Sequence, residues 1–117
     1  MFQVGRSTQL DHFLSRVVKN CGRMYINEYE VWQLADADET GLGGQEAYFL
    51  DQASMLLYGT ISPDTWRNDV AVYFDDQSPR AMKAYQCIIS QLPARDPSLP
   101  NAYKDVFKVV PQVSGNE

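Results

Sequence analysis

The sequence predicts a small all-α protein, and three observations lead to that prediction. Its 117 residues are the size of one compact domain, and 44% of them are hydrophobic, which is enough to fill a core. Apolar residues recur at intervals of three and four along most of the chain, as they do in amphipathic helices. Two Ser-Pro pairs, Ser62-Pro63 and Ser78-Pro79, have the residue types typical of a helix N-cap and first helical position. We therefore predict a single globular domain over residues 1–117 with five to six short helices.

The first predicted helix has the strongest amphipathic pattern. Its apolar positions follow the i, i+3, i+4, i+7 spacing that places side chains on one side of a helix. These positions are Leu10, Phe13, Leu14, Val17, Val18 and Cys21. Ser7 or Thr8 is available as the N-cap and Gly22 follows the last apolar position, so both ends of the helix are defined.

A second helix is predicted over about residues 28–36. Asn27 stands three residues before Glu30, which is the spacing of a capping box, so Asn27 is the predicted N-cap. The glycine-rich stretch 41–44 then predicts a turn, because several glycines close together raise the entropy cost of regular structure.

Three further helices are predicted between residue 45 and Pro93. The first of them ends at Gly59, and the other two begin at the Ser-Pro pairs. The middle one is ambiguous, because the apolar residues of 69–74 alternate as they would in a strand and valines favour that state. An α+β fold with a short strand near 69–74 is therefore the alternative to the all-α prediction.

The C-terminal part is predicted to hold a loop and one more helical element. Two prolines three residues apart exclude a helix interior within 94–101. A further apolar stripe runs over 103–110 and is stopped by Pro111. We expect the tail, residues 112–117, to fray.

Charge is distributed unevenly along the chain, although the net formal charge is only -5. Residues 1–25 carry four basic residues and one acidic residue, a net +3. Residues 26–78 carry eleven acidic residues and one arginine, a net -10, and residues 79–117 return to +2. This acidic middle block repels phosphates, so we expect no direct nucleic-acid binding by it and instead a partner with a basic surface.

The stretch VWQLADADETG, residues 31–41, resembles the end of the first helix and the start of the loop in EF-hands, especially those of the EH variety. The resemblance covers residues 31 to about 57 and implies a single calcium loop over 36–47. The ligands that it implies are Asp36, Asp38, Thr40 and Glu46.

The chain departs from the EF-hand pattern at the last ligand. The bidentate Glu of an EF-hand loop stands at position 12, whereas Glu46 stands at position 11 counted from Asp36. One residue of helix turns a side chain by about 100°, so Glu46 would point away from an ion that Asp36 and Asp38 face. An acidic interhelical turn without metal or cofactor is therefore the favoured interpretation, and a calcium-responsive module is the alternative.

Groups of residues suited to catalysis are few, so we do not predict an enzyme. His12 is the only histidine and flanks the apolar stripe of the first helix, where a surface position is expected. Asp75 and Asp76 are adjacent and would point about 100° apart on a helix, which suits capping better than paired acid-base chemistry. No glycine-rich phosphate loop follows a predicted strand.

The cysteines and the apolar segments indicate the cellular compartment in which the protein is expected. Cys21 and Cys87 are far apart and form no CxxC motif, and the chain does not start with a signal-like apolar run. Two reduced thiols are therefore the favoured expectation, and a Cys21–Cys87 disulfide is the alternative. Because no apolar run has the length of a membrane span, we expect a soluble cytoplasmic protein that does not bind membranes.

Aromatic side chains gather in the acidic block. Seven of the nine Tyr and Trp residues fall in it or at its edge, and these side chains are the ones that most often anchor interfaces. We therefore predict a small acidic protein that acts by binding, as an inhibitor, antidote or adaptor that occludes a basic functional surface of a larger protein. That partner would be, for example, a nucleic-acid-binding protein. Phage counter-defence proteins and immunity proteins offer an analogy of size and charge.

The predicted contact residues cluster on the second helix and the turn that follows it. They are Glu28, Glu30, Trp32, Asp36, Asp38 and Glu39. A different interpretation of the same pattern stays open, in which the acidic block folds against the basic ends of the chain and its aromatic residues form the core.

Overall fold

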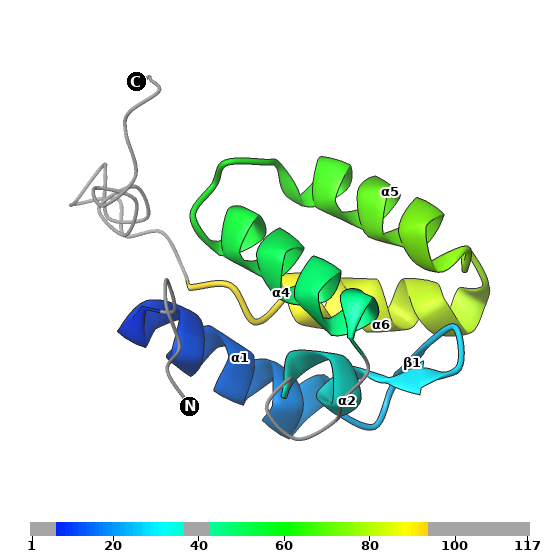
Figure 1. The fold of residues 1–117 in the computed structure, drawn as a ribbon, viewed down its shortest axis with the longest axis horizontal. Helices are drawn as coiled ribbons and strands as arrows, with labels where there is room; N and C mark the ends of the chain where they lie inside the picture. The colour runs from blue at the N-terminus through cyan, green and yellow to red at the C-terminus, as the bar shows by residue number, and fades with distance from the viewer. Residues whose placement is uncertain (1–6, 37–42, 94–117) are drawn as a thin grey trace.

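The computed structural model describes residues 7–36 and 43–93, which form five helices and a two-stranded antiparallel hairpin around one hydrophobic core. The helices are α1 (Thr8–Cys21), α2 (Val31–Ala35), α4 (Gly44–Leu57), α5 (Pro63–Phe74) and α6 (Pro79–Ile89), and the strands are β1 (Tyr25–Ile26) and β2 (Tyr29–Glu30). In Figure 1, α4 lies between α5 and α1 with α6 behind it, and α2 and the hairpin lie at the end of the molecule where α1 stops. The all-α prediction is confirmed, with the short hairpin as an addition.

Three helices begin at the serines that the sequence indicated. The hydroxyls of Ser7, Ser62 and Ser78 accept hydrogen bonds of 3.0 to 3.1 Å from the backbone N–H three residues later. In α5 and α6 the serine is followed by proline in the first turn, where a backbone N–H would have no partner within the helix, so the N–H that proline lacks costs no hydrogen bond. Each such cap stabilises its helix by about 1 kcal/mol.

Residues 69–74 are helical, so the strand that the alternative fold needed there is absent. The segment forms the second half of α5, and Val70, Ala71 and Phe74 turn inward together with Trp66 one turn earlier. The β-branched residues did not decide the outcome, because burial of this helical stripe outweighs a weak intrinsic preference for strand. Asp75 ends α5 in the left-handed conformation, with φ of 54°.

The predicted second helix is only partly correct. Asn27 is not an N-cap but the turn residue of the β1–β2 hairpin, with φ of 57°, a conformation that Asn tolerates better than most residues. Its backbone N–H donates to the Asp76 carboxylate and its side-chain amide to the Phe74 carbonyl, each at 2.6 Å. These bonds hold the turn against the end of α5, so the helix begins only at Val31, with Glu30 as its N-cap.

The prediction of two reduced thiols is wrong. Cys21, the last residue of α1, and Cys87 on α6 form a disulfide, and their Cα atoms lie 6.0 Å apart. Cys21 belongs to the buried stripe of α1, as expected, whereas Cys87 lies beside the stripe of α6. The pairing follows from the packing of α1 on α6, which joins residues 66 positions apart in sequence.

Several predictions concern residues that lie outside the described part of the chain. They are the loop at 94–101, the element at 103–110, the tail at 112–117, and the contact residues Asp38 and Glu39. The single domain over 1–117 therefore stays a prediction. None of the helices in the described residues has the length and apolar character needed to cross a membrane.

Candidate functional site

The described members of the predicted contact set lie around the hairpin and α2. Glu28 is exposed in the hairpin turn, and Glu30 is half-buried at the end of β2. Trp32, in the first turn of α2, has 37% of its side chain exposed. Asp36 is half-buried at the C-cap of α2, where its N–H donates to the Trp32 carbonyl at 2.9 Å. Of these residues, the structure brings Glu30 and Trp32 into direct contact.

The Glu30 carboxylate is already used within the molecule. It accepts hydrogen bonds from the Tyr25 hydroxyl at 2.8 Å and from the Trp32 indole N–H at 2.5 Å. These two bonds, the Tyr25 bond foremost, hold the pKa of the Glu30 carboxyl below its ordinary value. Glu30 therefore fixes the orientation of the Trp32 indole and keeps only part of its hydrogen-bonding capacity for a partner.

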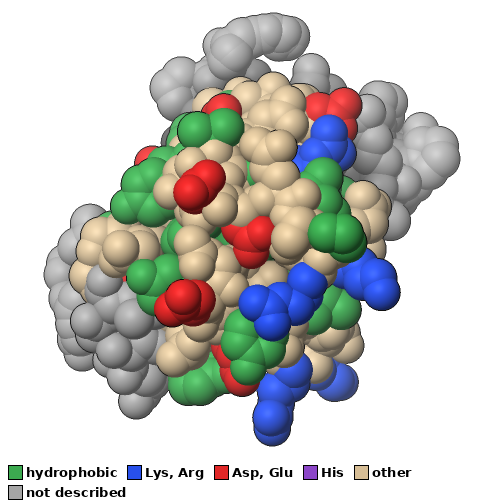
Figure 2. Space-filling model, turned by 90° about the vertical axis from the view of Figure 1, so that its right-hand side faces the viewer, with side chains coloured by type: hydrophobic (Ala, Val, Ile, Leu, Met, Phe, Trp, Pro, Cys, Tyr) green, Lys and Arg blue, Asp and Glu red, His purple; other side chains and the backbone are tan. Residues whose placement is uncertain are grey.

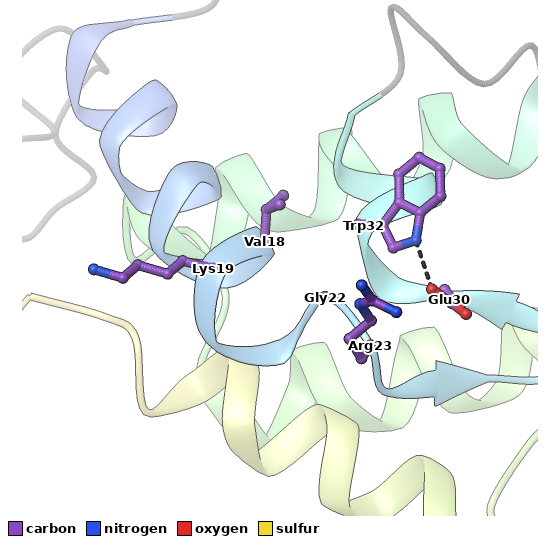
Figure 3. Close-up of a pocket in the computed structure, with 6 residues that line it drawn as sticks. All are labelled: Val18, Lys19, Gly22, Arg23, Glu30 and Trp32. Atoms are coloured by element: carbon purple, nitrogen blue, oxygen red, sulfur yellow. Dashed lines mark hydrogen bonds between the residues drawn. The ribbon is translucent and has the colours of Figure 1, made fainter.

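Trp32 borders an open hollow of about 540 Å³, within the size range of ligand sites. We call it the Trp32 hollow, and its lining residues are Val18, Lys19, Gly22, Arg23, Glu30 and Trp32. Four of these six residues are exposed, so the hollow is open to solvent. Figure 3 shows the Arg23 side chain directed toward Glu30 and the indole, while Lys19 extends away from them.

Gly22 is what allows α1 and α2 to meet at this hollow. A Cβ atom at this position would overlap the Val18 carbonyl oxygen and come within 3.2 Å of the Trp32 Cβ. The Gly22 carbonyl also accepts a hydrogen bond of 3.1 Å from the Trp32 N–H. Trp32 is therefore held at two points, through its backbone N–H by Gly22 and through its indole N–H by Glu30.

A second candidate surface lies across α4 and α5. The rings of Tyr48 and Tyr73 stack with centroids 3.7 Å apart and planes 9° apart, and Tyr73 is 44% exposed. The Tyr48 hydroxyl donates to the Asp69 carbonyl at 3.1 Å. Burial raises the pKa of Tyr48, and the nearby Asp69, Tyr73 and Asp51 raise it further. We call Tyr48, Asp51, Asp69 and Tyr73 the α4–α5 face.

Carboxylates of the acidic block face water in the described part of the chain. Glu28, Asp51, Asp69 and Asp75 are exposed, and no described Lys or Arg lies within ion-pair distance of them. The ion pair that does form there, Arg67 with Asp64 at 3.2 Å, joins two residues of the same block. Figure 2 shows most of the Lys and Arg side chains together at the lower right of that view and most acidic side chains elsewhere.

The alternative in which the aromatic residues form the core is correct for part of the set. Trp66 is fully buried and Tyr58 is 7% exposed. Tyr25, Tyr29 and Tyr48 are half-buried, whereas Trp32 and Tyr73 are exposed.

Glu46, the implied last ligand of a calcium loop, lies in the first turn of α4. Its Oε1 accepts a hydrogen bond from the Gly43 N–H at 3.2 Å, which satisfies one of the free N–H groups of the helix start. The side chain is only 5% exposed, and its Oε2 has no hydrogen-bond partner. Within residues 7–36 and 43–93 no three His, Cys, Asp or Glu residues are grouped as a metal site, and residues 37–42 of the implied loop lie outside that part.

The residues considered for catalysis have other positions or roles. His12 is exposed on α1, and both cysteines are bonded to each other. Asp75 caps α5, and the Asp76 carboxylate accepts hydrogen bonds from the backbone N–H groups of Asn27 and Ser78. Burial alone would raise the pKa of the Asp76 carboxyl, but these bonds and the Ser78 hydroxyl hold it below its ordinary value. That the protein is not an enzyme stays a prediction.

The fold and the two surfaces define a small helical protein with one acidic, aromatic face and one hollow beside basic residues. No protein-family model matches the chain, and no curated protein or solved structure is significantly similar to it. Sequence reasoning did not single out Arg23 or the α4–α5 face. The available signals were the spacings of Tyr48 with Asp51 and of Asp69 with Tyr73, each one helical turn apart.

Proposed function

We propose that the protein acts by binding a larger protein, as an inhibitor, antidote or adaptor whose acidic surface covers a basic functional surface of that partner. The observation that carries this proposal is the stacked Tyr48–Tyr73 pair, half-buried at Tyr48 and exposed at Tyr73, near the exposed Asp51 and Asp69. Tyrosines bury a large area with few rotatable bonds, which makes them good interface anchors. Carboxylates without internal cation partners attract Lys and Arg side chains and accelerate docking.

Two patches within the acidic block are candidates for the contact. One is the α4–α5 face, and the other is the sequence-predicted set around α2, in which the carboxylates of Glu28 and Asp36 make no hydrogen bond or ion pair with the described residues. The α4–α5 face is the better anchor, because its aromatic rings and its free carboxylates occur together, whereas the Glu30 carboxylate beside Trp32 is already bonded.

Affinity capture from the native host, with retained proteins identified by mass spectrometry, tests the proposal. We expect the wild-type chain to retain a protein with a basic surface at about 0.1 M salt and to release it as added salt screens the charges. The variant Asp51→Asn/Asp69→Asn should not retain that protein. The variant Gln9→Lys/Gln86→Lys is the matched control, since it changes the net charge equally at exposed positions on α1 and α6.

The outcomes separate the explanations. Loss in the Asn variant but not in the control supports the α4–α5 face, and loss only in Asp36→Lys/Asp38→Lys/Glu39→Lys places the contact at the predicted turn. A partner retained by all variants, or retained equally in high salt, contradicts docking by the acidic surface.

A calcium-responsive module is the second candidate function, and the buried Glu46 Oε2 without a partner is the observation that favours it. Calcium supplies the kind of partner that a carboxylate oxygen prefers. Calorimetric titration with calcium tests the idea, with Glu46→Gln as the control because its amide oxygen still accepts from Gly43. Absence of heat at about millimolar calcium, the weakest affinity of natural calcium modules, ends it.

The disulfide indicates the redox compartment in which the protein acts. Disulfides persist in oxidising compartments and are rare in the cytosol. The Cys21–Cys87 bond therefore favours action outside a reducing cytosol over the cytoplasmic location predicted from sequence. Alkylation of free thiols in protein taken from the native host, followed by mass measurement, distinguishes the two locations.

A further inference from the structure

We propose that the Trp32 hollow is a second binding site, of opposite polarity to the α4–α5 face, and that it takes an acidic peptide segment in which an aliphatic side chain is flanked by carboxylates. This inference does not rest on the proposed function, because it concerns a surface other than the α4–α5 face and a ligand of opposite charge.

The apolar half of the site consists of Val18 and Trp32. Val18 belongs to the apolar stripe of α1, but it is 38% exposed, whereas the other members of that stripe are buried. Trp32 is 37% exposed, and both residues border the same hollow. An aliphatic side chain placed between them would remove apolar surface of both from water, at roughly 25 cal/mol for each Å².

The basic half of the site consists of Lys19 and Arg23. The other described arginines are engaged within the protein: Arg16 donates to the Gln91 carbonyl, Arg67 pairs with Asp64, and Arg80 lies over the Tyr25 ring. The Arg23 guanidinium has no hydrogen bond or ion pair within the described residues, and the same holds for the Lys19 amine.

Arg23 is exposed at the edge of the hollow, its side chain points toward Glu30 and the indole (Figure 3), and its guanidinium makes no hydrogen bond within residues 7–36 and 43–93. A guanidinium of this kind binds a carboxylate through two parallel hydrogen bonds. Glu30 lies near enough to interact with the charge of Arg23, but it forms no hydrogen bond or ion pair with it, and its carboxylate accepts hydrogen bonds from Tyr25 and Trp32.

The site is ordered before a ligand arrives. The bond from its indole N–H to Glu30 and the close approach of Gly22 fix Trp32, so little side-chain entropy is lost on binding. A short peptide segment fits better than an enclosed small molecule, because four of the six lining residues are exposed. A long polyanion such as nucleic acid is disfavoured by the exposed Glu28 and by Asp36 nearby in the chain.

Nuclear magnetic resonance titration of the isotope-labelled chain tests the proposal. Two peptide pools share a central leucine or valine, which is flanked by Asp and Glu in one pool and by Lys and Arg in the other. We expect the acidic pool to shift the amide signals of Gly22 and Arg23 and the indole N–H signal of Trp32. The indole signal of Trp66, which is fully buried, is the internal control and should not move.

Two pairs of matched variants locate the binding. Arg23→Glu should weaken binding of the acidic pool by about tenfold or more, whereas Lys83→Glu, the same charge reversal at an exposed cation on α6, should leave it unchanged. Val18→Ser should also weaken it, whereas Val72→Ser, at a valine that is 70% exposed on α5, should not.

The proposal is overturned if the acidic pool shifts none of these signals, if the basic pool shifts them equally, or if Arg23→Glu and Lys83→Glu have the same effect. Shifts that depend on protein concentration without peptide would show a second copy in the hollow and would also overturn it. Asp51→Asn/Asp69→Asn should still bind the acidic pool, so failure of this proposal and failure of the proposed function are distinguishable.

Discussion

Removal of the Cys21–Cys87 disulfide is the perturbation with the largest effect that the structure predicts. The bond ties the C-terminal end of α1 to α6 across a separation of 66 residues. In the chain-entropy description, a closed loop of this length lowers the entropy of the unfolded chain and stabilises the folded state by about 4 kcal/mol. That is a large part of the 5–15 kcal/mol typical of whole domains, so the reduced protein should be close to marginal stability.

The effect is measured by urea unfolding of the oxidised protein, the reduced protein and the variant Cys21→Ala/Cys87→Ala. The free energy of unfolding should fall by about 4 kcal/mol on reduction. For a chain of 117 residues this corresponds to a decrease in Tm of roughly 15 °C. The variant should lose about 1 kcal/mol more, because Cys21 is buried and its sulfur leaves a small cavity.

The variant also supplies the control. Reducing agent should change the stability of the wild-type chain and leave that of Cys21→Ala/Cys87→Ala unchanged. A loss of less than about 1 kcal/mol on reduction, well below the usual range for native disulfides, would refute the reasoning. It would mean that the reduced unfolded chain keeps residual structure that already limits its entropy.

Three smaller perturbations test individual contacts. Gly22→Ala should lower the free energy of unfolding by about 1–3 kcal/mol, since its Cβ meets the Val18 carbonyl, and should shift the Trp32 indole signal; an unchanged spectrum contradicts the close approach. Asp76→Asn should lower the free energy of unfolding at neutral pH. That free energy should then fall less than in the wild-type chain when the pH is lowered. The lowered pKa of Asp76 implies a contribution that is complete above about pH 4 and is lost as the pH falls through the folded-state value, so unfolding at neutral and acidic pH should show a flatter profile. Ser62→Ala should lower the free energy of unfolding by about 1 kcal/mol in the same assay, and an unchanged value would show that the Ser62 cap does not stabilise α5.

The sequence by itself determined the helices α1, α4, α5 and α6. The starts of α1, α5 and α6 depend on a serine and the N–H group three residues later, and the buried sides of all four helices depend on apolar residues about one turn apart. These interactions are local, so the pattern of neighbouring residues contains the information. The acidic block was also visible in the sequence, whereas the exposure of Glu28, Asp51, Asp69 and Asp75 was left open there and was decided by the structure.

Only the tertiary structure decided which elements meet. Asn27 looked like a cap and became a hairpin turn because Asp76 and Phe74, nearly fifty residues away in sequence, accept its hydrogen bonds. The disulfide, the Tyr48–Tyr73 stack and the approach of Arg23 to Trp32 likewise join different elements. The sequence of each helix shows which residues form its apolar side, but the element against which that side packs is decided by the packing of the whole core.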